Sequence, residues 1–203
     1  GPSDDPALGR LHARLQAERI APEDIDTVIL THWHWDHVWG NTRADGSPAF
    51  PHARFVVGRT EWDWATAEAN RQALQDVGGE RSRDNLLAVA GRLSLADEGT
   101  EIVPGIRAIA APGHTAGHLA LLLASEGEQL LCIGDVVHHP IHVEHPEWHT
   151  DFDFAAAQTV ATRRALFARA ADEGMLVFAP HLPPMGVGHI VAAGDSWRWE
   201  AVE

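Results

Sequence analysis

Three histidines and one aspartate crowd a single short segment of the chain, residues 32–37 (HWHWDH). The apolar run just before this segment is predicted to form a buried strand. Residues two apart on leaving a strand point the same way, so His32 and His34 can hold one cation. A turn after them lets Asp36 and His37 face a second cation. Because imidazole and carboxylate suit zinc and other borderline divalent metals, the segment predicts metal binding rather than a solvated loop.

Three later segments each end a predicted strand with a similar side chain. His114 lies in the glycine-rich turn APGHTAGH, Asp135 follows one buried apolar run, and His181 follows another. Taken singly, the three could be a turn histidine, a helix cap and a surface histidine. Because all three lie at strand ends and come after the first histidine-rich segment, a shared metal site explains them better.

These motifs, in this order, resemble those of the metallo-β-lactamase superfamily, and specifically of its dinuclear metallohydrolase branch, which includes lactonase-like and methyl-parathion-hydrolase-like enzymes. The resemblance runs from about residue 8 to residue 199. It implies an α/β (α+β) fold of the αββα sandwich type, with two zinc ions, or other divalent transition metals, at one edge of the two sheets. The ligand set that it implies is His32, His34 and His114 for one ion, Asp36, His37 and His181 for the second, and Asp135 as the bridge between them. It also implies that His118 is a structural neighbour and not a ligand.

The resemblance also implies a reaction. A hydroxide bridged by two zinc ions attacks a carbonyl or phosphoryl centre, and Asp36 orients it and carries a proton to the leaving group. His138 stands three residues after Asp135, where many acyl-homoserine lactonases have a tyrosine. Either His138 donates a hydrogen bond to a substrate oxygen, or it contacts the ligand Asp135 and holds it in position. Trp148 and Phe152 follow on the same loop and are our candidates for the substrate pocket.

We therefore expect a dinuclear zinc hydrolase that opens lactones or cleaves related carboxylic esters. The alternatives are an organophosphate triester hydrolase on the same site, a β-lactamase, and a sulfur dioxygenase with a single iron. Asp135 argues against a dedicated β-lactamase, because those enzymes usually lack the bridging carboxylate. The acidic net charge argues against a nuclease of the same fold. The complete set of ligand residues argues against a non-catalytic binding module.

The composition narrows the chemistry and the partners. The 203 residues carry 29 acidic and 15 basic side chains, for a net charge of −14, which repels nucleic acid. Every basic residue other than histidine is arginine, and the absence of lysine and tyrosine excludes lysine nucleophiles and phenol donors. No apolar run approaches the ~18 residues of a membrane span. The expected partner is a small ester or lactone, with no nucleic acid and no membrane; the oligomeric state is open, a homodimer being one candidate.

The pattern of apolar and turn residues predicts one domain over 1–203, in which helices alternate with short strands. The predicted helices are 6–19, a mostly helical stretch 60–90 broken near Gly78, and 155–171. The predicted strands are 27–31, 54–57, one around Ile102, 106–110, 119–123, 129–133, 175–179, 188–192 and 197–199.

The short stretch before His32 leads to a further expectation. In the superfamily several strands normally precede the first histidine segment, but only 31 residues precede His32 here. We therefore expect the domain to be N-terminally incomplete, lacking its N-terminal strands, with about 40–80 more residues upstream in the natural protein.

The cellular location is open, with the cytoplasm favoured. The clustered histidines His139, His142, His145 and His149 are expected to form a solvated loop rather than a third metal site. Trp33 and Trp35 are expected to pack in the core.

Overall fold

The computed structural model describes residues 9–74 and 79–202. It divides into two compact units, one ending at Leu95 and the other beginning at Ala96. Each unit has its own cluster of buried apolar side chains. Whether the two act as the single domain expected over 1–203 stays a prediction.

The first unit contains a three-stranded sheet in the order β1-β2-β3. Its elements are α1 (Leu11–Ala17), β1 (Thr27–Leu30), α2 (Trp35–Val38), β2 (Arg54–Gly58), α3 (Arg59–Thr66), α4 (Arg71–Leu74), α5 (Gly79–Ala88) and β3 (Leu93–Ala96). Strand β1 pairs in parallel with β2, with Thr27 opposite Arg54. Phe55, Val56 and Val57 of β2 are all buried, because a parallel central strand is covered on both faces.

The second unit contains a seven-stranded sheet in the order β10-β9-β8-β7-β6-β5-β4. Its elements are β4 (Glu101–Val103), β5 (Ile106–Ala110), β6 (Leu119–Ser125), β7 (Glu128–Cys132), α6 (Ile141–Glu144), α7 (Ala156–Asp172), β8 (Leu176–Phe178), β9 (Val187–Ala193) and β10 (Ser196–Ala201). Every described pair of neighbouring strands is antiparallel except β7 with β8. That parallel pair needs a long crossover, which carries α6 and α7.

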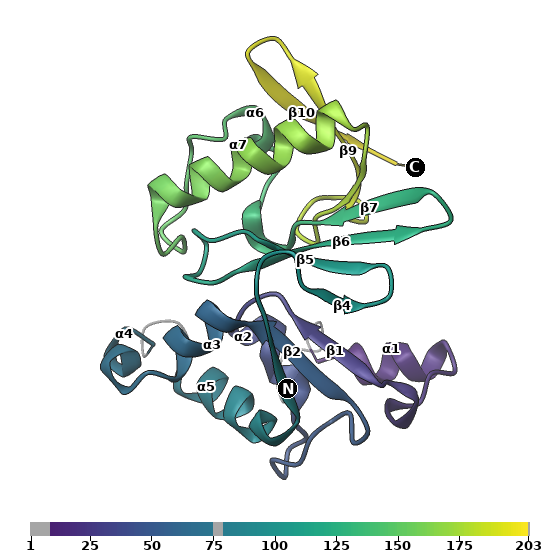
Figure 1. The fold of residues 1–203 in the computed structure, drawn as a ribbon, viewed down its shortest axis with the longest axis vertical. Helices are drawn as coiled ribbons and strands as arrows, with labels where there is room; N and C mark the ends of the chain where they lie inside the picture. The colour runs from purple at the N-terminus through teal and green to yellow at the C-terminus, as the bar shows by residue number, and fades with distance from the viewer. Residues whose placement is uncertain (1–8, 75–78, 203) are drawn as a thin grey trace. The chain divides into compact units, whose positions relative to one another are not determined.

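Helix α7 covers the second sheet and closes its core (Figure 1). Leu166, Phe167 and Ala170 on one side of the helix are buried, and they belong to the same cluster as Val177 of β8 and Ile190 of β9. These helix positions recur at the three- and four-residue spacing of an amphipathic helix. The helix therefore packs by the apolar stripe that its sequence predicts.

The mixed α/β class predicted from the sequence is confirmed, and most predicted elements are present within a few residues. Strand β3 and helices α2 and α6, each four residues long, were not predicted. Among the described residues of the stretch 60–90, the α-helices are α3, α4 and α5. The predicted break at Gly78, the first three residues of the helix predicted over 6–19, and the N-terminal tail lie outside the described residues. The single cysteine, Cys132, is in a strand as predicted but is only half-buried.

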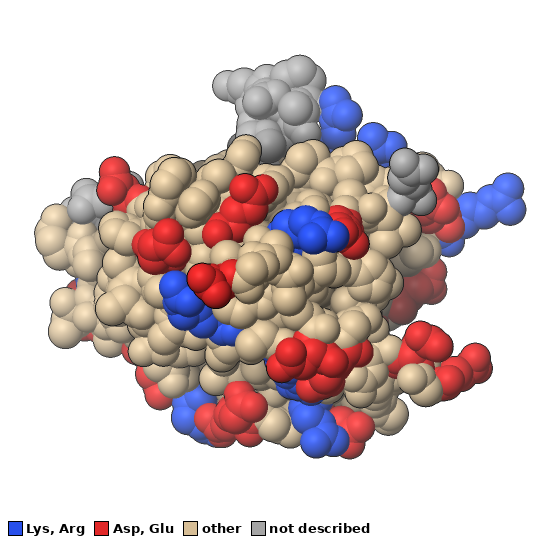
Figure 2. Space-filling model, turned by 90° about the horizontal axis from the view of Figure 1, so that it is seen from above, with Lys and Arg blue, Asp and Glu red and all other residues tan. Residues whose placement is uncertain are grey.

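Charged side chains of both signs lie on the face of the molecule that Figure 2 shows. On the face shown in Figure 2, acidic and arginine side chains lie interspersed, and the described residues there form no continuous basic patch. This fits the excess of acidic residues in the sequence. Of the helices that the structure describes, none combines the length and the apolar character needed to cross a bilayer.

Candidate metal centre

In the first unit, the histidine-rich segment leaves the end of β1 and turns into α2. The ring of His32 lies 4.7 Å from that of His34 and 4.0 Å from that of His37, centroid to centroid. Asp36 joins them, with its Oδ2 atom 3.5 Å from Nε2 of His37. The backbone of His34 is still extended, and the helix begins directly after it. The turn predicted from the sequence is thus formed, and within this unit it gathers all four predicted ligands.

A buried carboxylate supports this turn from α3. The backbone N–H of Trp33 donates a hydrogen bond of 2.9 Å to Oε1 of Glu61, whose side chain is fully buried. Trp33 is also buried and stacks on Trp64, so it packs in the core as expected. Trp35 does not, since 39% of its surface is exposed on α2. No sequence motif predicts the role of Glu61, because 28 residues separate it from Trp33.

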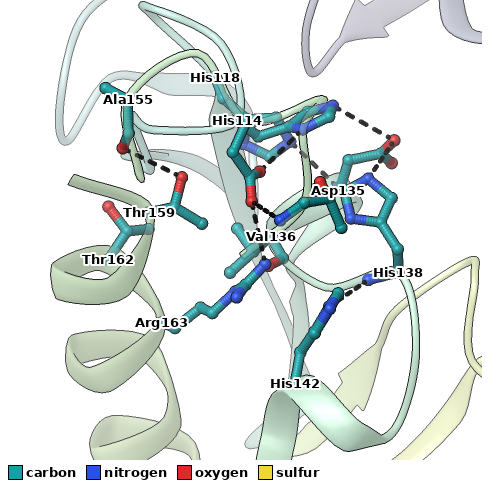
Figure 3. Close-up of polar contacts among 12 residues, drawn as sticks. His114, His118, Asp135, Val136, His138, His142, Ala155, Thr159, Thr162 and Arg163 are labelled. Atoms are coloured by element: carbon teal, nitrogen blue, oxygen red, sulfur yellow. Dashed lines mark hydrogen bonds and ion pairs between the residues drawn. The ribbon is translucent and has the colours of Figure 1, made fainter. Parts of the chain in front are cut away.

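In the second unit, three imidazoles surround one oxygen of Asp135. Figure 3 shows two of them, His114 and His138, beside Asp135. Oδ2 of Asp135 lies 3.2 Å from Nε2 of His181, 3.6 Å from Nε2 of His114 and 3.6 Å from Nε2 of His138. Asp135 sits in a short helical turn just past β7, and His114 sits in the turn between β5 and β6. The fold therefore brings together the three predicted ligands of this unit and adds His138 to them.

The donor set of this cluster fits a divalent cation. Nδ1–H of His114 donates to Oδ1 of Asp153 at 3.3 Å. With the proton on Nδ1, the lone pair of Nε2 faces the carboxylate oxygen of Asp135, and a cation between the two relieves their repulsion. Ligand atoms of His114, Asp135 and His138 all lie within 4.8 Å of one another, which is a spacing that one ion can span.

The carboxylate of Asp153 is held in its ionised form. Burial by itself opposes ionisation, but hydrogen bonds from His114 and from the backbone of Thr150, together with the charge of Arg163, lower the pKa of Asp153 below its ordinary value. Its side chain is fully buried, as is that of Arg163. Asp153 was not predicted as a site residue, since no local motif marks it.

His118 contacts the backbone and lies outside the cluster. The backbone N–H of Asp135 donates to its Nε2 atom at 3.2 Å, and the ring is fully buried. This agrees with the structural role that the resemblance implied. It also fixes the start of the turn that carries Asp135.

His138 contacts Asp135 and also lies beside one of the two predicted pocket residues. Its ring centroid is 6.4 Å from that of Phe152, of whose surface 66% is exposed, and Trp148 is 53% exposed. The Nδ1 atom of His138 is buried and has no hydrogen-bond partner among the described residues. Its Nε2 atom, by contrast, faces Oδ2 of Asp135 at 3.6 Å.

The other histidines of this loop do not assemble into a site. Within the described part of the chain, no group of three ligand side chains includes His139, His142, His145 or His149. His142 is buried and accepts a hydrogen bond from the backbone N–H of His138, and His145 stacks on Trp148. The expectation of a solvated loop is wrong for His142, whose side chain the loop buries.

The sequence matches one known protein superfamily over most of its length. The profile of the metallo-beta-lactamase superfamily matches residues 1–181. An N-acyl homoserine lactonase from a Bacillus species is 32% identical over 114 residues, which make up 55% of this chain and 39% of that protein. Beta-lactamase-like protein 2 homolog from Drosophila melanogaster is 31% identical over 126 residues, or 61% of this chain and 36% of that protein. The matched part thus spans about two fifths of the length of these curated relatives.

Two solved structures share the fold over nearly the whole chain. The dizinc quorum-quenching lactonase AidC, in complex with its product, has a TM-score of 0.90 at 25% identity, covering 98% of this chain and 71% of that one. The hydrolase AbOPH of the beta lactamase superfamily has a TM-score of 0.87 at 30% identity, covering 97% and 70%. A mixed α/β fold with histidine and aspartate clusters at its strand ends is the architecture of a class of metallohydrolases. This chain belongs to the metallo-beta-lactamase superfamily, as its motifs predicted.

Proposed function

We propose that this chain is a hydrolase dependent on two divalent ions, most readily zinc, which opens lactones or cleaves related carboxylic esters. The observation that carries the proposal is the convergence of three imidazole nitrogens on one oxygen of Asp135. The similarity to an N-acyl homoserine lactonase and to a dizinc lactonase supports the choice of substrate class.

The proposed ligands are those that the sequence motifs mark in each unit. They are His32, His34, Asp36 and His37 of the first unit, and His114, Asp135 and His181 of the second. Two such ions would supply Lewis acidity and lower the pKa of a water to near neutrality. Asp135 is the proposed bridge, because it is the carboxylate around which the imidazoles of its unit gather.

Three side chains near the cluster have proposed roles toward the substrate. Asp36 is partly exposed, with 34% of its side-chain surface accessible, so it can pass a proton to the leaving group. His138, as the Nε2-protonated tautomer, would donate a hydrogen bond to the substrate carbonyl oxygen. Phe152 and Trp148 expose apolar rings on the same loop and would receive an acyl or aryl group.

The chemistry of this loop favours a neutral substrate. The chain has no lysine, and Arg163 is fully buried and bound to backbone carbonyls and to Asp153. Arg164 is exposed beside this loop but pairs with Glu147 at 3.8 Å, so neither arginine offers a charge free to pair with a phosphomonoester or a free carboxylate. A lactone carries no such charge, and its apolar chain matches the exposed aromatic rings.

The test is a comparison of zinc-loaded protein on acyl-homoserine lactones, simple γ- and δ-lactones, paraoxon-type triesters and β-lactams, with metal content measured on the same preparation. We expect close to two zinc ions per chain and the highest kcat/KM on lactones. The variant His138→Ala should lose about 10-fold in kcat/KM with its metal content unchanged. The exposed neighbour His139→Ala serves as the control and should keep full activity.

Two results would contradict the proposal in different ways. A kcat/KM for triesters or β-lactams ten times that for every lactone would overturn the substrate class and leave the metallohydrolase. One iron per chain with thiol-oxidising activity would instead identify a sulfur dioxygenase.

A further inference from the structure

A buried chain of three side chains links helix α7 to the turn that carries His114. Oδ1 of Asp153 accepts the hydrogen bond from Nδ1–H of His114 at 3.3 Å, and Oδ2 of Asp153 lies 3.5 Å from Nη2 of Arg163. The side chains of Asp153 and Arg163 are fully buried, and 3% of that of His114 is exposed. Figure 3 shows His114 and Arg163 joined through this network on one side of Asp135. Neither Asp153 nor Arg163 is among the ligands or the substrate-facing residues proposed above.

The direction of the first hydrogen bond determines the state of the ring. An ionised carboxylate can only accept hydrogen bonds, so the proton of neutral His114 must be on Nδ1. Nε2 then carries the lone pair, and it is Nε2 that lies 3.6 Å from Oδ2 of Asp135. A metal ion needs that lone pair, because a protonated ring nitrogen cannot be a ligand.

Arg163 holds the carboxylate in place and also ties down the loop around it. Its Nε–H donates to the carbonyl oxygen of Val136 at 2.7 Å, directly after Asp135. Its Nη1 atom donates to the carbonyl oxygens of Pro146 and Trp148. One guanidinium therefore holds both ends of residues 136–148, the segment that carries His138 and Trp148. Its charge also balances that of Asp153, which would otherwise be an unpaired buried anion.

We propose that Asp153 is a positioning residue for His114. It keeps the ring in the Nδ1-protonated tautomer with Nε2 directed at the proposed metal. Arg163 holds the carboxylate of Asp153 in position beside the turn that carries His114. The metal part of this inference rests on the proposed function, whereas the tautomer part does not. Carboxylate partners of ligating histidines typically contribute about 10- to 100-fold to metal affinity.

The test compares Asp153→Asn with Asp151→Asn. Both substitutions remove one negative charge from the same loop, but Asp151 is exposed and lies two residues away. Asparagine at 153 keeps the size of the side chain and an oxygen for the backbone N–H of Thr150, so the loop should fold. Zinc affinity is measured by competition with a chromophoric chelator. We expect the weaker of the two zinc ions to dissociate about 10-fold more readily from Asp153→Asn, with Asp151→Asn indistinguishable from the parent.

A second readout requires no metal. The histidine rings of the chelator-treated, ¹⁵N-labelled protein report their tautomers through two-bond proton–nitrogen correlations, and His114→Gln assigns the signals of interest. We expect a clean Nδ1-protonated pattern for His114 in the parent, and a mixed or Nε2-protonated pattern in Asp153→Ala. A residue with a merely structural role would not shift this tautomer.

The outcomes separate this inference from the proposed function. Unchanged zinc affinity in Asp153→Asn, with zinc bound by the parent, would overturn the metal part. An unchanged tautomer of His114 in Asp153→Ala would overturn the tautomer part, whether or not the parent binds zinc. Should Asp153→Ala fail to fold, Arg163→Lys replaces it, because lysine keeps the charge near Asp153 but cannot span the three carbonyl oxygens. A parent that binds no zinc contradicts the proposed function alone.

Discussion

At the scale of single residues, His142 has a strongly lowered pKa although the proposed reaction does not use it. Burial, and after it the positive charge of Arg163, lowers the pKa of His142 from its ordinary value of 6.5 to about 4. The neutral ring accepts a hydrogen bond of 3.3 Å at Nδ1 from the backbone N–H of His138. Protonation would turn that acceptor into a donor and break the bond. His142 therefore serves the loop that carries His138 only while it is neutral.

The lowered pKa of His142 makes the free energy of unfolding decrease as the pH falls. The unfolded chain takes up a proton on His142 near pH 6.5, whereas the folded chain takes it up only near pH 4. The contribution of neutral His142 is present above pH 6.5 and is lost as the pH falls toward 4. Between pH 7 and pH 5 the loss should be at most about 2 kcal/mol.

The measurement is urea unfolding of chelator-treated protein at pH 7 and pH 5. The variant His142→Asn keeps an acceptor oxygen but does not titrate, so its unfolding free energy should fall less over this interval than that of the parent. The exposed His139→Asn is the matched control and should follow the parent. Equal pH dependence of His142→Asn and the parent would show that the ring is protonated in the folded state as readily as in the unfolded one.

At the scale of elements, the turn that carries His114 is pressed against the beginning of α7. The backbone N–H of Ala155 donates to the carbonyl oxygen of Gly113 at 2.9 Å, and the hydroxyl of Thr162 donates to that of Pro112 at 2.6 Å. Gly113 has a φ of +137°, and a Cβ atom on it would lie 2.4 Å from the backbone nitrogen of Thr159. The crossover helix and the metal-site turn are therefore held at a spacing that only glycine permits.

We accordingly expect Gly113→Ala to destabilise the protein by about 3 kcal/mol, through the positive φ and the clash with the helix backbone together. Gly127→Ala is the matched control, since Gly127 also has a positive φ, of +89°, but open space around it. It should cost only about 1 kcal/mol. Thermal or urea unfolding of the two variants measures the difference. Equal losses in both would mean that the contact with α7 is loose enough to yield.

At the scale of the whole molecule, removal of the proposed ions should lower the stability of the folded chain. Ions that bind only the folded state stabilise it by about 2.7 kcal/mol when their free concentration is 100 times their Kd. For a chain of 203 residues this corresponds to a rise in Tm of about 5–10 °C.

The check is a pair of melting curves, with excess zinc and with chelator, for the parent and for Asp135→Ala. The parent should melt at the lower temperature in chelator. Asp135→Ala should show little difference between the two conditions, because the proposed bridge between the ions is gone. A parent Tm that does not respond to chelator would argue that the folded chain holds no ion.

The sequence alone determined the types and order of the proposed ligands and the class of fold. His32, His34 and Asp36 lie so close in the chain that local geometry alone groups them, and the apolar runs before His114, Asp135 and His181 mark strand ends without any knowledge of pairing. Side-chain periodicity reports which face of an element is buried, so the longer helices and strands could be predicted. The family resemblance rested on the same local motifs.

The tertiary structure decided which distant residues support those ligands. Asp153 lies 39 positions from His114, and Glu61 lies 28 positions from Trp33, so no periodic pattern links either pair. An aspartate or glutamate on a helix or loop reads locally as a solvated residue, and only the packing of α3 and α7 shows that these two are buried. The physical reason is that the cost of burying a charge is met by partners that the fold supplies from elsewhere in the chain.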